Sequence, residues 1–399
     1  MAEPILDHPK AAVGLLASFG TPLLKILHHP NFVVDYSGLT SLGKTTTQRA
    51  AGSVWGITDE AEPTENVIQS WNATQVGASE MGRILSGLPV IFDDSKTARS
   101  AKSIAEILYL VTNGKGRAKG AKNGGLRATA TTKTILISSG EQPITKFTHD
   151  GGLKTRTLVV EGSPFGKADD GTRTLTQGIA ASAIDHYGVA GQIWMQWVCD
   201  REDDWSGWVA DYRAAKETYG KASRSPGEGR LAAHRAFLEM VADFVGQALP
   251  ALQTALSSLI RSDEWDTLWA DMTSQAADPL EGQLALKQIG SWMQGHIELF
   301  EGQRSADTHP PNEWLGKWEK SESAALFKHA VDGQLESLGY DHEAVVRQWR
   351  SQGWLKADED GRHLDPRVSI AGQRGRNAYV LSTSGMEIAL EGEEEEIPF

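Results

Sequence analysis

The feature that most restricts the fold of this chain is one uninterrupted phosphate-binding loop pattern. Residues 38–45 read Gly-Leu-Thr-Ser-Leu-Gly-Lys-Thr, which fits G-x-x-x-x-G-K-T. Residues 31–37 (NFVVDYS) predict a short buried strand, and residues 45–55 predict the helix that follows. In this context the loop N–H groups and the helix N-terminus form a positive nest for phosphates. The pattern predicts an α/β P-loop domain, against the alternative of a glycine turn that only joins a strand to a helix.

The residue types of the loop each suit one task in a nucleotide site. Lys44 is expected to reach the β- and γ-phosphates of ATP, and the Thr45 hydroxyl is expected to bind Mg²⁺. The other residues expected to surround the phosphates are Gly38, Thr40, Ser41, Leu42, Gly43 and Thr46.

An acidic half of the site is predicted at residues 88–94 (LPVIFDD), an apolar strand that ends in two carboxylates. Ligands of parallel α/β sheets lie beyond the carboxyl ends of the strands, so this end would lie beside the phosphates. We expect Asp93 to hold Mg²⁺ through water and Asp94 to polarise the attacking water. The alternative is a strand that simply runs into a turn.

A third strand is predicted at residues 134–138 (TILIS), between the other two. A polar residue at its tip would contact the γ-phosphate, and both Ser138 and Ser139 fit this role. Glu141 is the rival of Asp94 as general base, and its alternative is an ordinary turn carboxylate.

Arg156 precedes a further predicted strand at residues 158–160. Its positive charge would stabilise the transition state at the nucleotide of a neighbouring subunit. The alternative is an exposed arginine at a strand edge.

Composition limits the class of protein. The chain has 399 residues with 40% hydrophobic and 23% charged residues, which predicts a soluble protein of two or three domains. No apolar run approaches the roughly 20 residues of a membrane span, and the first ten residues lack the order of a signal peptide. The single cysteine, Cys199, fits a reducing cytoplasm.

One basic segment stands out from a net charge of −13, at residues 113–133. It holds no acid, it is rich in glycine, and it predicts a loop that grips the phosphate backbone of single-stranded DNA. The alternative is a solvated run of charge. The residues expected to contact DNA here are Lys115, Arg117, Lys119, Lys122 and Arg127.

Tryptophan usage predicts the domain organisation, because only two of the 13 tryptophans precede residue 194. The later tryptophans are expected to fill helix–helix cores rather than stack on bases. The predicted parts are a P-loop ATPase core at 1–173, a helical domain at 174–310, a winged-helix-like domain at 311–383 and an acidic tail at 384–399.

The winged helix is predicted from helices at residues 322–338 and 342–352, followed by a hairpin near residues 367–381. Such domains bind DNA, here origin duplex, but they also serve as protein docking modules. The arginines expected to face DNA are Arg347, Arg350, Arg374 and Arg376.

Several blocks of the sequence together resemble one P-loop family. They are residues 35–56 (DYSGLTSLGKTTTQRAAGSVWG), 71–74 (WNAT), 109–116 (YLVTNGKG) and 137–141 (ISSGE), followed by weaker blocks at 186–191 and 353–355. The chain resembles the helicase-like proteins of phages, plasmids and integrative elements grouped as domain of unknown function 927, which often occur beside or fused to primases.

The resemblance implies an ATPase core like those of AAA+ proteins and superfamily-3 helicases, which assembles into a ring, expected to be a hexamer, and moves along DNA. It carries over onto Lys44, Thr45, Asp93 and Asp94, and it matches Arg156 to the family's arginine. The second acid is usually Glu in such motors, and Asp94 is one methylene shorter. No primase signature precedes the ATPase, so priming would need a separate primase.

The last nine residues (EGEEEEIPF) resemble the tip of bacterial single-stranded-DNA-binding proteins. In that reading Ile397, Pro398 and Phe399 dock in an apolar pocket of host replication proteins, and the acids steer toward a basic rim. The alternative is a solubilising acidic tail.

Three functions compete on these grounds. The first is an ATP-dependent DNA helicase or translocase for replication of a mobile element. The second is a non-translocating, ATP-switched initiator or loader that binds origin DNA and partners. A small-molecule kinase is the third, and the basic loop disfavours it.

Overall fold

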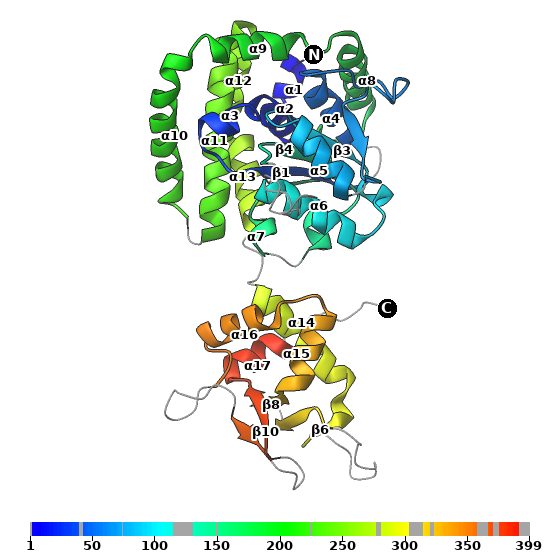
Figure 1. Cartoon of the computed structure of the whole chain (residues 1–399), viewed down its shortest axis with the longest axis vertical. Helices are drawn as coiled ribbons and strands as arrows, with labels where there is room; N and C mark the ends of the chain where they lie inside the picture. Colours follow the sequence, from blue (N-terminus) through cyan, green and yellow to red (C-terminus); the bar gives the residue numbers. More distant parts are fainter. Residues whose placement is uncertain are drawn as a thin grey trace, which may run out of the picture. The chain divides into compact units, whose positions relative to one another are not determined.

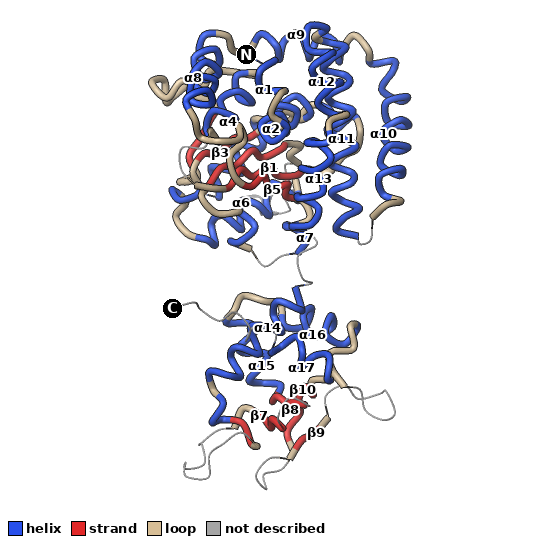
Figure 2. Tube along the Cα trace, turned by 180° about the vertical axis from the view of Figure 1, so that it is seen from behind, coloured by secondary structure: helices blue, strands red, loops and turns tan. Residues whose placement is uncertain are grey.

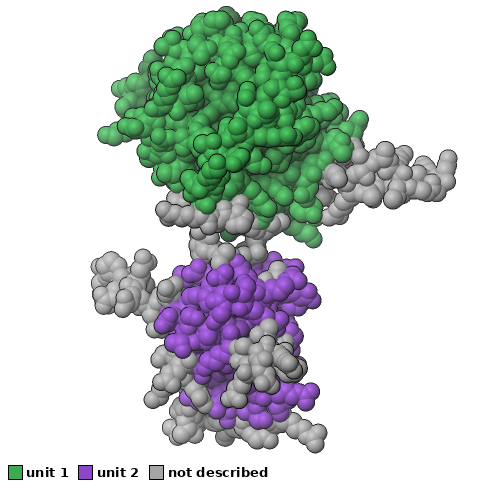
Figure 3. Space-filling model, turned by 90° about the vertical axis from the view of Figure 1, so that its left-hand side faces the viewer, with its two compact units in different colours: residues 1–278 green, residues 279–399 purple. Residues whose placement is uncertain are grey.

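The computed structural model describes residues 2–39, 43–73, 75–114, 131–148, 151–223, 226–276, 281–302, 314–319, 323–356, 366–369 and 375–390. Two compact units divide the chain, with unit 1 at residues 1–278 and unit 2 at residues 279–399 (Figure 3). Among the described residues, no helix combines the length and the apolar character needed to cross a bilayer.

Unit 1 is built around a parallel sheet in the order β2-β3-β4-β1-β5. Because all five strands run the same way, their carboxyl ends meet at one edge, and β4 lies between β3 and β1 as predicted. The strands are β1 (Phe32–Ser37), β2 (Ile68–Ser70), β3 (Val90–Asp93), β4 (Ile135–Gly140) and β5 (Thr157–Glu161).

Helices cover both faces of this sheet, which is why its strands are apolar on both sides. Phe32 and Val34 of β1 face one core together with the helices α2 and α4, whereas Val33 faces a second core with α6. The helices of this part are α1 (Ala2–Leu6), α2 (Pro9–Gly20), α3 (Leu23–Ile26), α4 (Lys44–Ser53), α5 (Gln75–Ile84), α6 (Ala101–Asn113) and α7 (Gly151–Lys154). Short 3-10 turns η1 (Ser95–Thr97) and η2 (Ile144–Phe147) follow β3 and β4.

The helical region after β5 packs on the sheet layer rather than forming a domain of its own. Trp194, Trp265 and Trp269 are buried in the same core as Phe32 of β1, so the predicted boundary at 173/174 divides one core. Figures 1 and 2 show α10 outermost, with α11 between it and the rest of unit 1. The helices are α8 (Asp170–Asp185), α9 (Val189–Cys199), α10 (Trp205–Gly220), α11 (Pro226–Ala248), α12 (Gln253–Ile260) and α13 (Asp263–Ala276), with 3-10 turns η3 (Glu202–Asp204) and η4 (Pro250–Leu252).

The described residues of unit 2 form four helices and a small sheet with the strand order β6-β7-β8-β10-β9. Its helices are α14 (Glu281–Gly295), α15 (Lys328–Ser337), α16 (His342–Ser351) and α17 (Thr383–Leu390), with the 3-10 turn η5 (Ile297–Leu299). Its strands are β6 (Phe300–Glu301), β7 (Gly316–Glu319), β8 (Ser323–Phe327), β9 (Arg367–Val368) and β10 (Arg376–Val380).

Unit 2 corrects three sequence-based expectations. Residues 323–327 were expected to begin a helix, but they form β8 because both neighbouring strands, β7 and β10, pair with them. Residues 383–390, placed mostly in the tail, form α17, which packs so closely on α14 that a Cβ at Gly290 would lie 1.7 Å from the Ala389 carbonyl oxygen. α14 itself belongs to unit 2, so the unit boundary lies 32 residues before the predicted one at 310/311. The predicted helix at 342–352 and the β9–β10 hairpin are confirmed.

Candidate nucleotide site

The glycine-lysine loop connects β1 to α4 at the carboxyl edge of the sheet. Gly43 caps the start of α4 with φ +88°, a left-handed conformation that favours glycine. A Cβ at this position would also lie 2.6 Å from Phe165, so only glycine fits both the backbone and the space. Thr40, Ser41 and Leu42 lie outside the described residues.

The Lys44 side chain folds back over the start of the loop. Its Nζ donates hydrogen bonds to the carbonyl oxygens of Gly38 (2.8 Å) and Leu39 (2.7 Å). Partial burial lowers the pKa of the ammonium, while the carboxylates around it act in the opposite direction. Glu141 acts most strongly among them, ahead of Asp93 and Asp94. The loop lysine therefore lies within an acidic rim.

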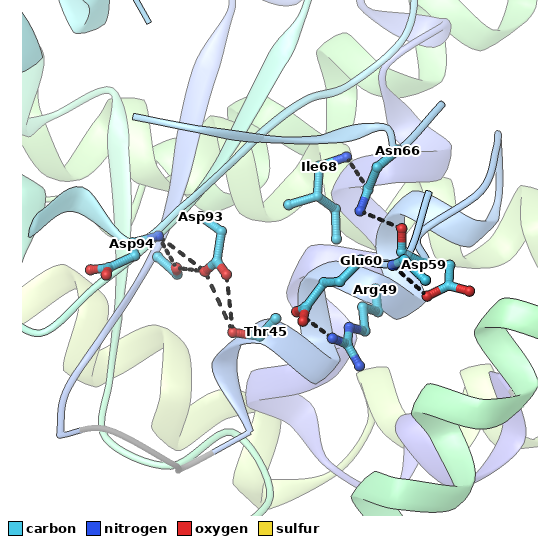
Figure 4. A network of polar contacts seen from close by, with 10 residues as sticks. Thr45, Arg49, Asp59, Glu60, Asn66, Ile68, Asp93 and Asp94 are labelled. Atoms are coloured by element: carbon cyan, nitrogen blue, oxygen red, sulfur yellow. Dashed lines mark hydrogen bonds and ion pairs between the residues drawn. The ribbon is translucent and has the colours of Figure 1, made fainter. Parts of the chain in front are cut away.

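Thr45 and Asp93 bring two oxygen groups together from separate elements. The Thr45 hydroxyl lies 3.3 Å from Oδ2 and 3.5 Å from Oδ1 of Asp93 (Figure 4). The Ser139 hydroxyl donates to Oδ1 of Asp93, and the Asp94 N–H lies 3.0 Å from both that oxygen and the Ser139 hydroxyl. Of the two serines considered from the sequence, Ser139 joins this group, whereas the Ser138 side chain is buried on the other face of the sheet.

The two candidate bases are connected through Lys96. Asp94 has φ +55°, and its Oδ1 accepts a hydrogen bond of 3.1 Å from the Lys96 N–H, which caps η1. The Lys96 ammonium forms an ion pair with Glu141. Figure 4 shows the Asp94 carboxylate pointing away from Thr45, in contrast to that of Asp93.

These groups line a cavity of about 480 Å³. Gly43, Lys44, Thr45 and Thr46 form one side, and the two aspartates with Ser139 and Glu141 form another. A second hollow of about 360 Å³ shares Gly43 and Thr176 with the first and extends along the start of α8. Both hollows thus lie beside Gly43 at the start of α4. The second hollow is lined further by Ser163, Ala168, Asp169, Asp170, Thr172 and Arg173.

Three residues of the first cavity were not expected as site residues from the sequence, namely Lys96, Gly140 and Thr176. Lys96 follows the acidic pair by two positions, so a basic residue shortly after two carboxylates was the available signal. Thr176 reaches the cavity because α8 packs on α4, and no local pattern indicates that contact.

Arg156 lies at the opposite edge of the sheet from the glycine-lysine loop. It precedes β5, its carbonyl oxygen accepts the Val33 N–H at 2.9 Å, and its Nη1 lies 3.2 Å from Oδ1 of Asn113. It does not line the cavity described above. Within one copy of the chain, Arg156 is therefore not part of this site.

The residues expected to contact DNA are only partly described. Arg347 is exposed on α16, Arg350 is half-buried on the same helix, and Arg376 is exposed on β10 with its guanidinium 5.5 Å from the centre of the Phe327 ring. Figure 2 shows α16 and the β9–β10 hairpin at different ends of unit 2. Those outside the described residues are Lys115, Arg117, Lys119, Lys122, Arg127 and Arg374, as are the tail residues Ile397, Pro398 and Phe399.

The donor set suits a metal ion that shares its ligands with a nucleotide. In the part of the chain that the structure describes, no group of three or more His, Cys, Asp or Glu is placed to hold a metal alone. Thr45 and Asp93 supply oxygen ligands only, and Mg²⁺ typically takes one or two protein oxygens together with phosphates and water. The residues present therefore fit Mg²⁺ bound with ATP.

The fold and this edge define an α/β protein with a parallel sheet and a glycine-lysine loop facing acidic strand ends. Comparison with known proteins narrows this class. Residues 8–131 match the family model described as "Domain of unknown function (DUF927)", and residues 281–384 match the "Cch helix turn helix domain". No curated protein matches the chain.

Among solved structures, the chain is similar to one described as "SCCmec type IV Cch - active helicase". The TM-score is 0.69 at 17% sequence identity, over 96% of this chain and 68% of that chain. At this sequence identity the similarity concerns the fold alone. Nearly the whole length of this chain therefore shares its fold with a helicase of a mobile element. The helix-turn-helix match coincides with most of unit 2.

Proposed function

We propose that this protein is an ATP-dependent DNA helicase or translocase that serves the replication of a phage or other mobile element. The observation that carries the proposal is the Thr45 hydroxyl 3.3 Å from the Asp93 carboxylate, beside Lys44 and at the carboxyl edge of a parallel sheet. Phosphates would lie on the loop N–H groups and the α4 N-terminus, with Lys44 exchanging its carbonyl partners for phosphate oxygens.

The residues around the cavity divide the remaining work. Thr45 and Asp93 would hold Mg²⁺, which when bound neutralises charge on the β- and γ-phosphates. Ser139, which already bonds Asp93, would contact the γ-phosphate. The second hollow, which shares Gly43 and Thr176 with the first, would receive the nucleoside.

Glu141 is our choice for the group that accepts a proton from the attacking water. It acts on Lys44 more strongly than Asp94 does, and the Lys96 ammonium holds its carboxylate by an ion pair. One oxygen of Asp94 already accepts the Lys96 N–H, so Asp94 would mainly shape the turn after β3. The expectation that Asp94 polarises the attacking water stays a prediction, which mutagenesis can test.

Arg156 supports a ring rather than a monomer as the working form. Because it lies at the edge of the sheet away from the loop, it would reach a nucleotide only in a neighbouring copy. In the ring that we propose, such as a hexamer closed by head-to-tail contacts, that edge of one copy would lie near the loop of the next. The basic segment at residues 115–127 would line the channel for single-stranded DNA.

Unit 2 and the tail would connect the motor to its partners. The helix-turn-helix match favours contact with duplex DNA near an origin through Arg347 and Arg376. The terminal Ile-Pro-Phe would recruit host replication proteins, and a separate primase would supply primers. The alternative function is an initiator or loader that switches with ATP and does not translocate.

The decisive experiment measures ATP hydrolysis with and without single-stranded DNA, and then strand displacement. Lys44→Ala should abolish both activities, and Lys115→Glu combined with Lys119→Glu should abolish DNA stimulation and displacement. The matched control reverses two exposed lysines elsewhere, Lys102 and Lys221, and should keep both. Two results together would favour the initiator instead. ATP turnover would be slow without strand displacement, and origin binding would be lost only when Arg347 and Arg376 are changed.

A further inference from the structure

A buried carboxylate lies directly behind the nucleotide site. Asp35 is the fourth residue of β1, its side chain is fully buried, and it pairs in register with Ser138 of β4 and Val159 of β5. Side chains alternate along a strand, so Asp35 lies on the same face of the sheet as Val33, whose core also contains Ile144. Tyr36 lies on the opposite face. No step assigned above uses this group.

Asp35 is bound to the segment that carries Glu141. Its Oδ2 accepts a hydrogen bond of 2.8 Å from the N–H of Ile144, the first residue of η2. Oδ1 has no hydrogen-bond partner of good geometry among the described residues, although the Ser138 hydroxyl acts on the carboxylate. A buried carboxylate is costly unless it is bonded, so its retention here calls for a reason.

The connection between β4 and η2 is held at both ends by a carboxylate of a neighbouring strand. At its start, Ser139 donates to Asp93 of β3. At its end, Ile144 donates to Asp35 of β1. Glu141 lies between these two anchors and lines the cavity. Where Glu141 stands relative to the loop therefore depends on both anchors.

The charge of Asp35 is also linked to the loop lysine. Burial raises the pKa of Asp35 to about 6, while the Ile144 N–H and the Ser138 hydroxyl act in the lowering direction. Of the charged groups that act on it, Glu161 of β5 raises this pKa and Lys44 of α4 lowers it. The Asp35 carboxyl group therefore changes its charge within the pH range in which enzymes are assayed.

We propose that Asp35 is a positioning residue for ATP hydrolysis, whose ionised carboxylate holds Ile144 and thereby sets the place of Glu141 beside the nucleotide. The inference rests on the proposed ATPase function. It assigns Asp35 no contact with ATP, so its loss acts on turnover and not on nucleotide affinity. An ionised carboxylate accepts the Ile144 N–H more strongly than a protonated one.

The test compares the full-length parent with Asp35→Asn and Asp35→Ala. Asparagine keeps an oxygen for the Ile144 N–H but has no charge to lose. Alanine removes the acceptor. In Asp35→Ala we expect kcat to fall about tenfold or more at pH 8, with the dissociation constant of a non-hydrolysable ATP analogue changed less than about threefold. In the parent, kcat should fall below about pH 6, and this decline should be absent in Asp35→Asn.

Hydrogen exchange supplies a readout independent of turnover. The peptide covering residues 139–147 should lose the most protection in Asp35→Ala, which has no acceptor, and an intermediate amount in Asp35→Asn, which keeps a neutral one. If Asp35→Ala does not fold, the Asp35→Asn pH profile decides alone.

The inference is overturned if Asp35→Asn retains the acid decline of the parent, or if a folded Asp35→Ala turns over like the parent. These two results refute only the role of Asp35, provided that the parent binds and hydrolyses ATP. A parent that does neither would refute the proposed function itself.

Discussion

The ammonium of Lys96 forms an ion pair with the carboxylate of Glu141, and the Lys96 N–H donates a hydrogen bond to Oδ1 of Asp94. Both candidate bases are thus held by one short turn after β3. This arrangement makes their contributions separable by substitutions that keep the shape of the turn.

The first prediction concerns which carboxylate activates water. Glu141→Gln should lower kcat by about a hundredfold or more, because an amide cannot accept the proton. Asp94→Asn should cost less than about tenfold, since asparagine tolerates φ +55° and still offers an oxygen to the Lys96 N–H. Single-turnover hydrolysis with saturating ATP measures the difference. The reverse ranking would assign the role to Asp94.

The second prediction concerns the metal. Thr45→Ala removes the hydroxyl that faces Asp93 and should raise the Mg²⁺ concentration needed for half-maximal hydrolysis, with kcat lower by about tenfold to a hundredfold. Thr45→Ser keeps the hydroxyl and serves as the matched control, with a profile close to the parent. A Mg²⁺ titration at fixed ATP provides the measurement. Equal titrations for the alanine and serine variants would place the metal elsewhere.

The third prediction concerns the backbone of the loop. Gly43→Ala should lower the free energy of unfolding by about 1–3 kcal/mol and abolish ATP binding, because a Cβ meets Phe165 at 2.6 Å and φ is +88°. Gly166→Ala is the control: its φ is +82° but a Cβ there has nothing within 4 Å, so only the backbone strain remains. Urea unfolding of both variants separates the two effects. If Gly43→Ala destabilises the protein no more than Gly166→Ala does, the Phe165 side chain moves aside at little cost.

Local patterns predicted the elements that position the site. β1, β3 and β4 follow from short apolar runs that end beside glycine or in acids, and α4 follows from its place after the glycine-lysine pattern. Parallel strands bring those strand ends to one edge. Which serine faces the site is set by strand alternation relative to two cores. The sequence alone left Ser138 and Ser139 open, because it does not show which face of β4 lies toward α4.

The features that were missed depend on contacts distant in sequence. Residues 323–327 have a helix-compatible sequence, Ser-Ala-Ala-Leu-Phe, yet two strands pair with them. The boundary expected at 173/174 fails because Trp194 and Trp265 complete the core of the sheet domain. Asp35 was passed over because a lone acid in a strand carries no signal until Ile144 is brought to it.

The last prediction concerns a pair of histidines buried beneath the sheet. His29 Nε2 lies 2.8 Å from His234 Nδ1, and His29 also meets the Tyr212 hydroxyl. Burial lowers the pKa of His234 to about 3 and that of His29 well below its usual value. Because the unfolded chain binds these protons and the folded chain does not, their contribution to stability is present above about pH 6.5 and is lost as the pH falls.

Each such histidine should remove about 1.4 kcal/mol of stability per pH unit below about pH 6.5. Asp35, with its raised pKa, acts in the opposite sense below about pH 6. The measurement is the free energy of urea unfolding between about pH 7.5 and 5. His234→Gln should flatten this slope, whereas His186→Gln, at an exposed histidine, should leave it unchanged. An identical slope for parent and His234→Gln would show that the buried pair accepts protons in the folded state.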